Sequence, residues 1–142
     1  MPDYIGPHIT RQEYECPCCK KLPPYFPARK PWIFDTFYEI RLEWSKPIPI
    51  GPPSGGGGYR CPLFNLGTGG SLLSVHLFGE ALDLDLDNKK EVKQMKKLIE
   101  RLFPELRMGI YTETGTFIHI DKGFLIEPQA SENWEEGVRW HD

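Results

Sequence analysis

The sequence predicts one α+β domain, with a small and mainly antiparallel sheet flanked by helices. A chain of 142 residues is long enough to bury a single core. Apolar residues recur at helical spacing near 31–44 and 88–103, whereas strict alternation of apolar and polar residues occurs at 81–86. Strand-like runs on both sides of 113–116 predict a hairpin, and helices that precede and interrupt strands are typical of α+β domains.

The expected helices begin at recognisable N-terminal signals. Thr10 and Glu13 have the spacing of a capping box, so a short helix is expected to begin there. The segment 31–44 starts with proline, which suits the first helical turn, and carries an apolar stripe that would pack on the core. The segment 88–103 begins with an Asn that can cap a helix, and its apolar stripe is also expected to point inward.

The expected strands follow from period-two patterns. Between 81 and 86 leucine alternates with aspartate, so the leucines should face the core and Asp83 and Asp85 should share the other face of a half-buried strand. The acidic residues Glu80, Asp85 and Asp87 are expected to be solvated. The runs 108–112 and 117–120 would form the two arms of the hairpin.

The segment 48–58 is rich in proline and glycine. Ile48-Pro49-Ile50 predicts a short edge strand, because proline cannot donate to a central ladder. The stretch 52–58 contains four consecutive glycines and predicts a mobile loop beside the functional site. Too little core precedes it for an interdomain linker. A phosphate-binding loop is not indicated, since no Gly-Lys-Ser/Thr follows.

Composition excludes several classes of function. The net charge of -3 is small, and no cluster of Lys and Arg is interleaved with aromatic residues, so a nucleic-acid partner is not expected. No apolar run approaches the roughly 20 residues of a membrane span. The segment 1–4 lacks the positive patch and apolar stretch of a secretory signal, so we expect a protein made in the cytoplasm without a signal peptide. We also expect the protein to be a monomer.

The cysteines leave three alternatives open. Cys16, Cys18 and Cys19 lie in one short segment, and Cys16 and Cys19 have the spacing of a metal knuckle. A thiolate cluster completed by Cys61 would be a second, structural zinc site. The other interpretations are reduced and partly buried thiols, or one disulfide bond to Cys61. No second Cys-x-x-Cys pair is present to decide between them.

Two histidines and one aspartate carry most of the functional information. If the strands near 81–86 and 117–121 are neighbours, Asp83 and His119 can converge on one ion. His76 would arrive from the preceding loop, where Gly79 permits a tight approach. Three such ligands leave one coordination position for water, as in catalytic zinc sites. Two histidines and one carboxylate also bind non-haem iron, so an iron oxygenase stays an alternative.

Two segments carry a resemblance to a known family. They are Tyr59-Arg60-Cys61-Pro62 followed by Ser74-x-His76-x-x-Gly79-x-Ala81-x-Asp83, and later Phe117-Ile118-His119-Ile120-Asp121. Together they resemble the zinc D-Ala-D-Ala carboxypeptidase family, and most closely its small phage and prophage members. The likeness spans about residues 8–124, and 125–142 would be a C-terminal extension. It implies a hedgehog/DD-peptidase-like fold, in agreement with the α+β pattern.

The resemblance also implies roles for individual side chains. His76, Asp83 and His119 would bind Zn2+. Arg60 would hold a carboxylate or carbonyl of the substrate, a task that suits the bidentate guanidinium. Ser74 would orient a ligand or hydrogen-bond the substrate, although serine is equally typical of a turn.

The sequence differs from the family pattern at the position of the general base. Many relatives place an acid three residues before the last zinc histidine, or a histidine two residues before it. Here those positions are Thr116 and Phe117, and neither can take a proton from water. Asp121 is the predicted substitute, with the orientation of an imidazole as its alternative role. Glu113, at the hairpin tip, is a less favoured base.

These implied roles predict a zinc metallopeptidase that hydrolyses stem or cross-link peptides of peptidoglycan, of the D-Ala-D-Ala carboxypeptidase or endopeptidase type. It would act at the cell wall after lysis, as an endolysin does, or as a component of the phage particle. The alternative is a catalytically weak module that keeps the metal site and binds cell-wall peptide. Trp134 and Trp140 could stack on glycan sugars, but folding back over the core is the favoured interpretation.

Overall fold

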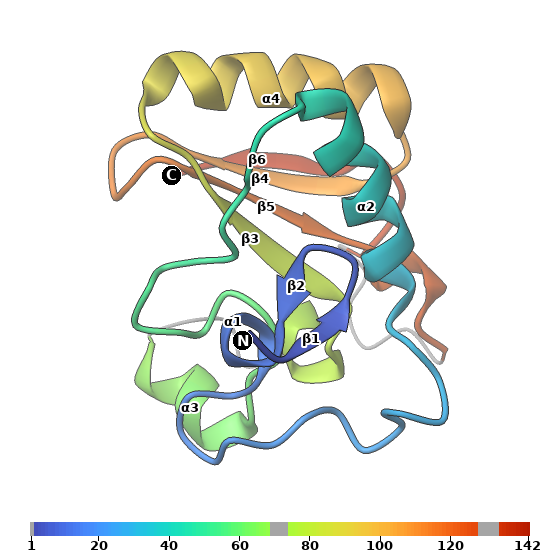
Figure 1. Ribbon diagram of the computed structural model, residues 1–142. Helices are drawn as coiled ribbons and strands as arrows, with labels where there is room; N and C mark the ends of the chain where they lie inside the picture. Colours follow the sequence, from blue (N-terminus) through green and yellow to red (C-terminus); the bar gives the residue numbers. More distant parts are fainter. Residues whose placement is uncertain (1, 69–73, 128–133) are drawn as a thin grey trace.

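Two layers form the upper part of the molecule in Figure 1, a sheet and the helices that cover it. The computed structural model describes residues 2–68, 74–127 and 134–142. Within these residues the sheet has four strands, in the spatial order β3 (Ala81–Asp85), β5 (Phe117–Asp121), β4 (Arg107–Tyr111) and β6 (Arg139–His141). Neighbouring strands are antiparallel except β4 and β6, which are parallel. The predicted α+β class with a mainly antiparallel sheet is confirmed.

The remaining elements are helices and a pair of short strands outside this sheet. They are β1 (Tyr4–Gly6), β2 (Ile9–Thr10), α1 (Arg11–Tyr14), α2 (Trp32–Trp44), α3 (Pro62–Gly67), α4 (Lys89–Leu102) and the 3-10 helices η1 (Val75–Phe78) and η2 (Gly123–Leu125). In Figure 1, α1 and α3 lie at the opposite end of the molecule from α4. None of the helices in the described ranges has the length and apolar character to cross a membrane.

Helices α1, α2 and α4 begin where the sequence predicts, whereas α3 was not predicted. At α1 the Thr10 hydroxyl accepts the Glu13 N–H at 3.2 Å, and the Glu13 carboxylate accepts the Thr10 N–H at 3.0 Å, which completes the capping box. At α4 the Asn88 side chain accepts the Glu91 N–H at 2.9 Å. Helix α2 ends at Trp44, and the next residue, Ser45, has a left-handed φ of 68°.

One face of the sheet packs on α2 and α4 to form the core. The strand residues on this face are almost fully buried, and they include Leu82, Leu84, Met108, Ile118 and Ile120. They meet the apolar stripe of α4, formed by Val92, Met95 and Ile99. Burial of each such side chain contributes about 1.5–3 kcal/mol, which fixes the register of the strands.

Alternation turns the residues between these apolar positions to the other face. Strand register pairs Asp83 with His119, and His119 with Gly109. The expectation of a half-buried strand at 81–86 is wrong in one respect, because Asp83 is only 5% exposed. The glycine-rich loop and η1 cover it, since Gly57 accepts the Asp83 N–H and the His76 ring contacts its carboxylate. A buried polar face therefore lies behind the apolar core.

The predicted edge strand at 48–50 is reduced to a single bridge between Ile50 and Leu84. Pro49 has no N–H to donate, but its carbonyl accepts the Asp85 N–H at 2.9 Å. Gly51 in turn donates its N–H to the Asp83 carbonyl at 3.1 Å. The segment thus runs beside β3 and covers its edge without forming a regular strand.

Glu80 is buried, and the prediction that it is solvated is wrong. Its side chain is 1% exposed, and it accepts the N–H groups of Trp32 and Ile33 at 3.1 and 3.0 Å. The N–H groups in the first turn of α2 have no partner within the helix, and the helix dipole favours an anion at this end. Arg29 completes the ion pair at 3.0 Å. Glu80 therefore joins the start of β3 to the start of α2.

Candidate metal centre

The three predicted ligand side chains meet on the polar face of the sheet. They are His76, Asp83 and His119. His76 Nε2 lies 3.2 Å from Asp83 Oδ1, and His119 Nδ1 lies 3.1 Å from the same oxygen. One ligand atom from each residue lies within 4.8 Å of the other two. Ligand atoms about 2.0–2.1 Å from a tetrahedral zinc ion stand about 3.3 Å apart. The cluster therefore fits a small divalent cation.

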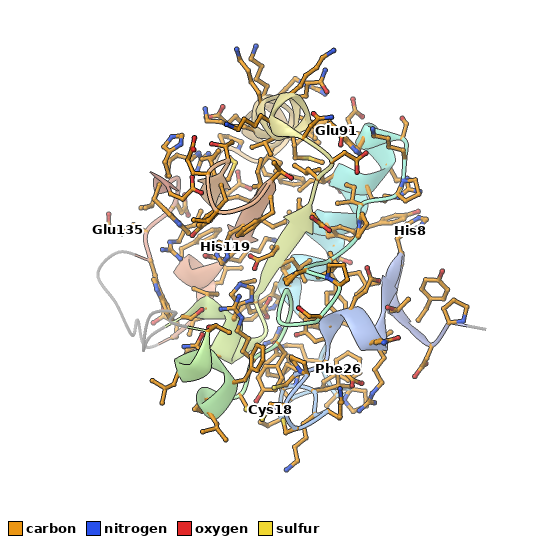
Figure 2. All side chains as sticks on the ribbon, turned by 90° about the vertical axis from the view of Figure 1, so that its left-hand side faces the viewer. His8, Cys18, Phe26, Glu91, His119 and Glu135 are labelled. Carbon is orange, nitrogen blue, oxygen red and sulfur yellow. The ribbon has the colours of Figure 1, made fainter. Side chains whose placement is uncertain are left out.

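Two of these side chains are brought together by strand register. Asp83 on β3 and His119 on β5 are directly paired, and their side chains share the polar face. Figure 2 shows the labelled His119 in the middle of the molecule, between α4 and the lower loops. Both residues are buried, at 5% and 9% exposure. The structure therefore brings Asp83 and His119 together, and their role as metal ligands stays a prediction.

His76 comes from the 3-10 helix η1 and not from an irregular loop. Ser74 caps η1, because its hydroxyl accepts the His76 N–H at 3.2 Å. Gly79 ends η1 with a φ of +73°, and a Cβ at this position would lie 2.4 Å from the Tyr14 hydroxyl. Only glycine fits there, and the tight turn that it permits places His76 next to the start of β3.

A backbone carbonyl fixes the orientation of the His76 ring. Nδ1 lies 2.6 Å from the carbonyl oxygen of Gly58, which can only accept, so Nδ1 carries the proton. The lone pair of Nε2 then faces Asp83. Sequence reasoning missed this role of Gly58, because it depends on a contact between segments 18 residues apart.

A carboxylate fixes the orientation of the His119 ring. Nε2 donates to Asp121 Oδ2 at 2.6 Å, which leaves Nδ1 for the cluster. The same Asp121 oxygen accepts from Arg107 at 2.7 Å, and Oδ1 accepts the Gly123 N–H at 2.9 Å. A carboxylate behind a histidine is the usual support of a metal ligand. Asp121 has 0% exposure, so its carboxylate is enclosed by these partners.

Arg107 is a part of this arrangement that the sequence reasoning missed. It is only 7% exposed and stands directly opposite Asp121 in the β4–β5 register. An arginine at the first position of an otherwise apolar strand, Arg107-Met108-Gly109-Ile110, was the available signal. Buried arginine requires a partner, and the paired strand supplies one.

The charges of the cluster follow from burial and these contacts. Burial lowers the pKa of His76. Burial has the same effect on His119, but hydrogen bonds to Asp121 and Asp83 outweigh it and raise the pKa of His119 to about 9. For Asp83, burial favours the neutral acid, but the two imidazoles outweigh it and hold its pKa far below the usual range. Asp83 is therefore held in the ionised form, which is the form of a carboxylate that binds a metal ion.

Arg60 joins this cluster to a neighbouring cavity of about 350 Å³. Its Nη2 donates to Asp83 Oδ2 at 3.3 Å, and its Nε donates to the Gly56 carbonyl at 2.7 Å. The cavity combines polar and aromatic walls, lined among others by Gly55, Arg60, Phe64, Asp85, Thr116 and Phe117. The glycine-rich loop therefore does lie beside the site, as the sequence predicts.

The two alternative bases lie in different surroundings. Asp121 is behind His119, on the side away from Asp83. The Glu113 side chain is 71% exposed and lies 3.8 Å from Lys89 at the surface. Thr116 and Phe117 line the cavity wall.

The tryptophans of the C-terminal segment fold back onto the domain. Trp134 is 3% exposed and packs with Val75, Ala81 and Ile126. The Trp140 ring lies 5.2 Å from the His119 ring, in a space left by Gly109, where a Cβ would lie 2.5 Å from the indole. Covering the core is confirmed for Trp134. The part of the predicted tail at 131–133 lies outside the described residues.

Comparison with known proteins agrees with this geometry. A sequence profile of the peptidase M15 family matches residues 7–121, which is most of the chain. No significant match was found among curated proteins or among solved structures. The match is long enough to show the family, so the chain belongs to the peptidase M15 family of metal-dependent peptidases. This confirms the resemblance to the zinc D-Ala-D-Ala carboxypeptidases.

Proposed function

We propose that this member of the peptidase M15 family is a zinc-dependent peptidase that cleaves stem or cross-link peptides of peptidoglycan. One observation carries the proposal: two imidazole nitrogens lie 3.2 and 3.1 Å from one carboxylate oxygen, beside a cavity that holds Arg60. Family membership supports peptide hydrolysis. The peptidoglycan substrate and a role in phage lysis are extrapolated from the resemblance described above.

The proposed ligand atoms are His76 Nε2, Asp83 Oδ1 and His119 Nδ1. Each is already oriented by a partner, since Gly58 holds His76, Arg60 holds the second oxygen of Asp83, and Asp121 holds His119. When bound, zinc would polarise the scissile carbonyl and lower the pKa of a water molecule to about 7.

Arg60 is proposed to capture the substrate. Its guanidinium lies between Asp83 and the cavity, with 15% of the side chain exposed. A guanidinium binds a peptide carboxylate or carbonyl through charge-assisted hydrogen bonds, and it is held in place by Gly56 and Asp83. The glycine-rich loop would then form one wall of the substrate cleft.

Asp121 is proposed to orient His119 and stabilise its ring, which was the alternative to the role of general base. Burial, the ion pair with Arg107 and the bond from Gly123 all support this choice. The contacts of Ser74 likewise support a positioning role toward His76, because its hydroxyl caps the helix that carries this histidine.

A second candidate function is a cell-wall peptide-binding module that retains the metal site. One observation favours it: the positions where relatives carry a base hold Thr116 and Phe117, and Asp121 is enclosed behind His119. Such a protein would bind peptidoglycan peptides through Arg60 and the ion, with little turnover.

Digestion of purified peptidoglycan separates these candidates. The zinc-loaded protein is expected to release D-alanine or new amino groups, and His76→Ala is expected to release none. Binding to sacculi without any release would favour the binding module. Neither release nor binding would contradict both functions, and dependence on iron and 2-oxoglutarate would favour the oxygenase alternative.

A further inference from the structure

A second group of metal-ligating side chains lies outside the site described above. Cys16 and Cys19 lie in the turn after α1, and Cys61 precedes α3; their sulfur atoms all lie within 4.8 Å of one another. Figure 2 labels Cys18 at the lower end of the molecule, away from Glu91 on α4. We propose that this cysteine cluster binds a structural zinc ion, with Cys18 as the fourth ligand.

Distances and chemistry fit that ion. Sulfurs bound to a tetrahedral zinc ion at about 2.3 Å stand about 3.8 Å apart, so the sulfurs of Cys16, Cys19 and Cys61, all within 4.8 Å of one another, need only a small contraction. Cys18 lies in the same turn, between Cys16 and Cys19, and its exposed thiol is the remaining cysteine of this segment. All four cysteines are free. Thiolates at this spacing repel one another, and a soft divalent cation removes that repulsion.

The backbone around Cys16 has the form of a metal knuckle. Cys16 donates its N–H to the Lys21 carbonyl at 3.0 Å, and Lys20 donates back to the Cys16 carbonyl at 2.8 Å. Lys20 adopts a left-handed φ of 60°, which closes the turn directly after Cys19. This hairpin brings the two sulfurs of the Cys-x-x-Cys pair to the same side.

Backbone N–H groups converge on the sulfur of Cys16. The Cys61 N–H lies 3.4 Å from it, and the N–H groups of Cys18 and Cys19 also point toward it. Burial raises the pKa of the Cys16 thiol, but these donors outweigh it and lower that pKa. Such N–H···S bonds stabilise a thiolate, which is the form that binds zinc.

The location explains what such an ion would do. Cys61 follows Arg60 directly, and the Arg60 N–H donates to the His76 carbonyl at 3.1 Å. On the other side, Tyr14 precedes Cys16 by two residues, and its hydroxyl donates to the Gly79 carbonyl at 2.7 Å. An ion at the cysteine cluster would therefore tie the N-terminal segment to the segment that positions His76 and Arg60.

Metal counting in two reciprocal variants tests the proposal on the full-length chain. Wild-type protein is expected to bind two zinc ions, His76→Ala one, and Cys61→Ser one. With cobalt(II) in place of zinc, His76→Ala should keep the near-ultraviolet thiolate-to-metal absorption, and Cys61→Ser should lose it. Absence of that absorption in folded wild-type and His76→Ala protein would overturn the proposal.

Thiol protection provides a test that needs no cysteine variant. In zinc-loaded His76→Ala the four cysteines are expected to resist alkylation, and a chelator should expose all four. Mass spectrometry of the intact chain counts the modified thiols. Equal alkylation with and without the chelator, or the mass of an internal disulfide, would overturn a zinc site and favour free thiols or a disulfide bond.

Discussion

The His-Asp-His cluster and the cysteine cluster are built in opposite ways. The first lies on the polar face of the sheet, where strand register pairs Asp83 with His119. The second lies between loops, with Cys16 and Cys61 separated by 45 residues and joined only through turns. The first uses nitrogen and oxygen atoms beside a cavity, and the second uses sulfur alone. This difference in ligands and surroundings is the one expected between a catalytic zinc site and a structural zinc site.

The comparison also shows what each cluster demands of the fold. A reactive ion needs ligands whose orientation is fixed, and here Gly58, Arg60 and Asp121 each hold one ligand. A stabilising ion needs only thiolates brought close enough to bind. Variants that remove one requirement at a time should therefore affect the two clusters unequally.

The largest expected effect comes from Asp83→Asn. Loss of the central carboxylate should remove the ion of the His-Asp-His cluster and lower turnover by about a thousandfold, because a metal contributes several kcal/mol to the transition state. The matched control is Asp85→Asn on the same strand and face, which should keep the full metal content. Metal analysis and peptidoglycan digestion check both variants. Asp83→Asn that binds as much metal as the wild-type protein would refute the role of Asp83 as a ligand.

A smaller effect is expected from Asp121→Asn. If Asp121 orients His119, the variant should bind zinc about 10–100-fold more weakly and recover most turnover at saturating zinc. If Asp121 is the base, turnover should stay low however much zinc is added. Titration of activity against free zinc distinguishes these outcomes, and the second would reverse our assignment.

Arg60→Ala is expected to act on substrate capture. Loss of charge-assisted hydrogen bonds worth about 1.5–3 kcal/mol should lower kcat/KM by about 10–100-fold, mainly through KM. Arg60→Lys keeps the charge but not the fork and should lose less. Steady-state kinetics on a soluble stem peptide measure this, and an unchanged rate at low substrate would exclude Arg60 from the substrate site.

The smallest expected effect is on the stability of the metal-free protein. The folded pKa of His119 is raised to about 9 from an ordinary value of 6.5. Its stabilising contribution is therefore complete below pH 6.5 and is lost as the pH rises through 9. Urea denaturation of metal-free protein should show this decline, and His119→Gln should reduce it. Equal pH dependence in both proteins would contradict the assigned pKa shift.

Alternation in the sequence predicted which faces of their strands Asp83 and His119 occupy. The leucines between 81 and 86 face the core, so Asp83 points to the opposite face of the strand. Its convergence with His119 also required that β3 and β5 be neighbours, which was an assumption at the level of sequence and which the structure shows. Helix caps at Thr10 and Asn88 were likewise local signals, and both were confirmed.

Contacts between distant segments could not be predicted in this way. Glu80 looked solvated, yet it binds the start of α2 some 47 residues away, and Arg107 meets Asp121 only through the β4–β5 register. The predicted edge strand at 48–50 does lie at the edge of β3 but is reduced to one bridge, because Pro49 lacks the donor that a regular ladder needs. Burial of charge depends on which partner the fold supplies, and local sequence does not contain that information.

Anomalous diffraction at the zinc absorption edge, from crystals grown with zinc, tests the central claim most directly. We predict a strong peak bonded to His76 Nε2, Asp83 Oδ1 and His119 Nδ1, at about 2.0–2.2 Å from each. A zinc-containing crystal with no peak among these three side chains would contradict the account.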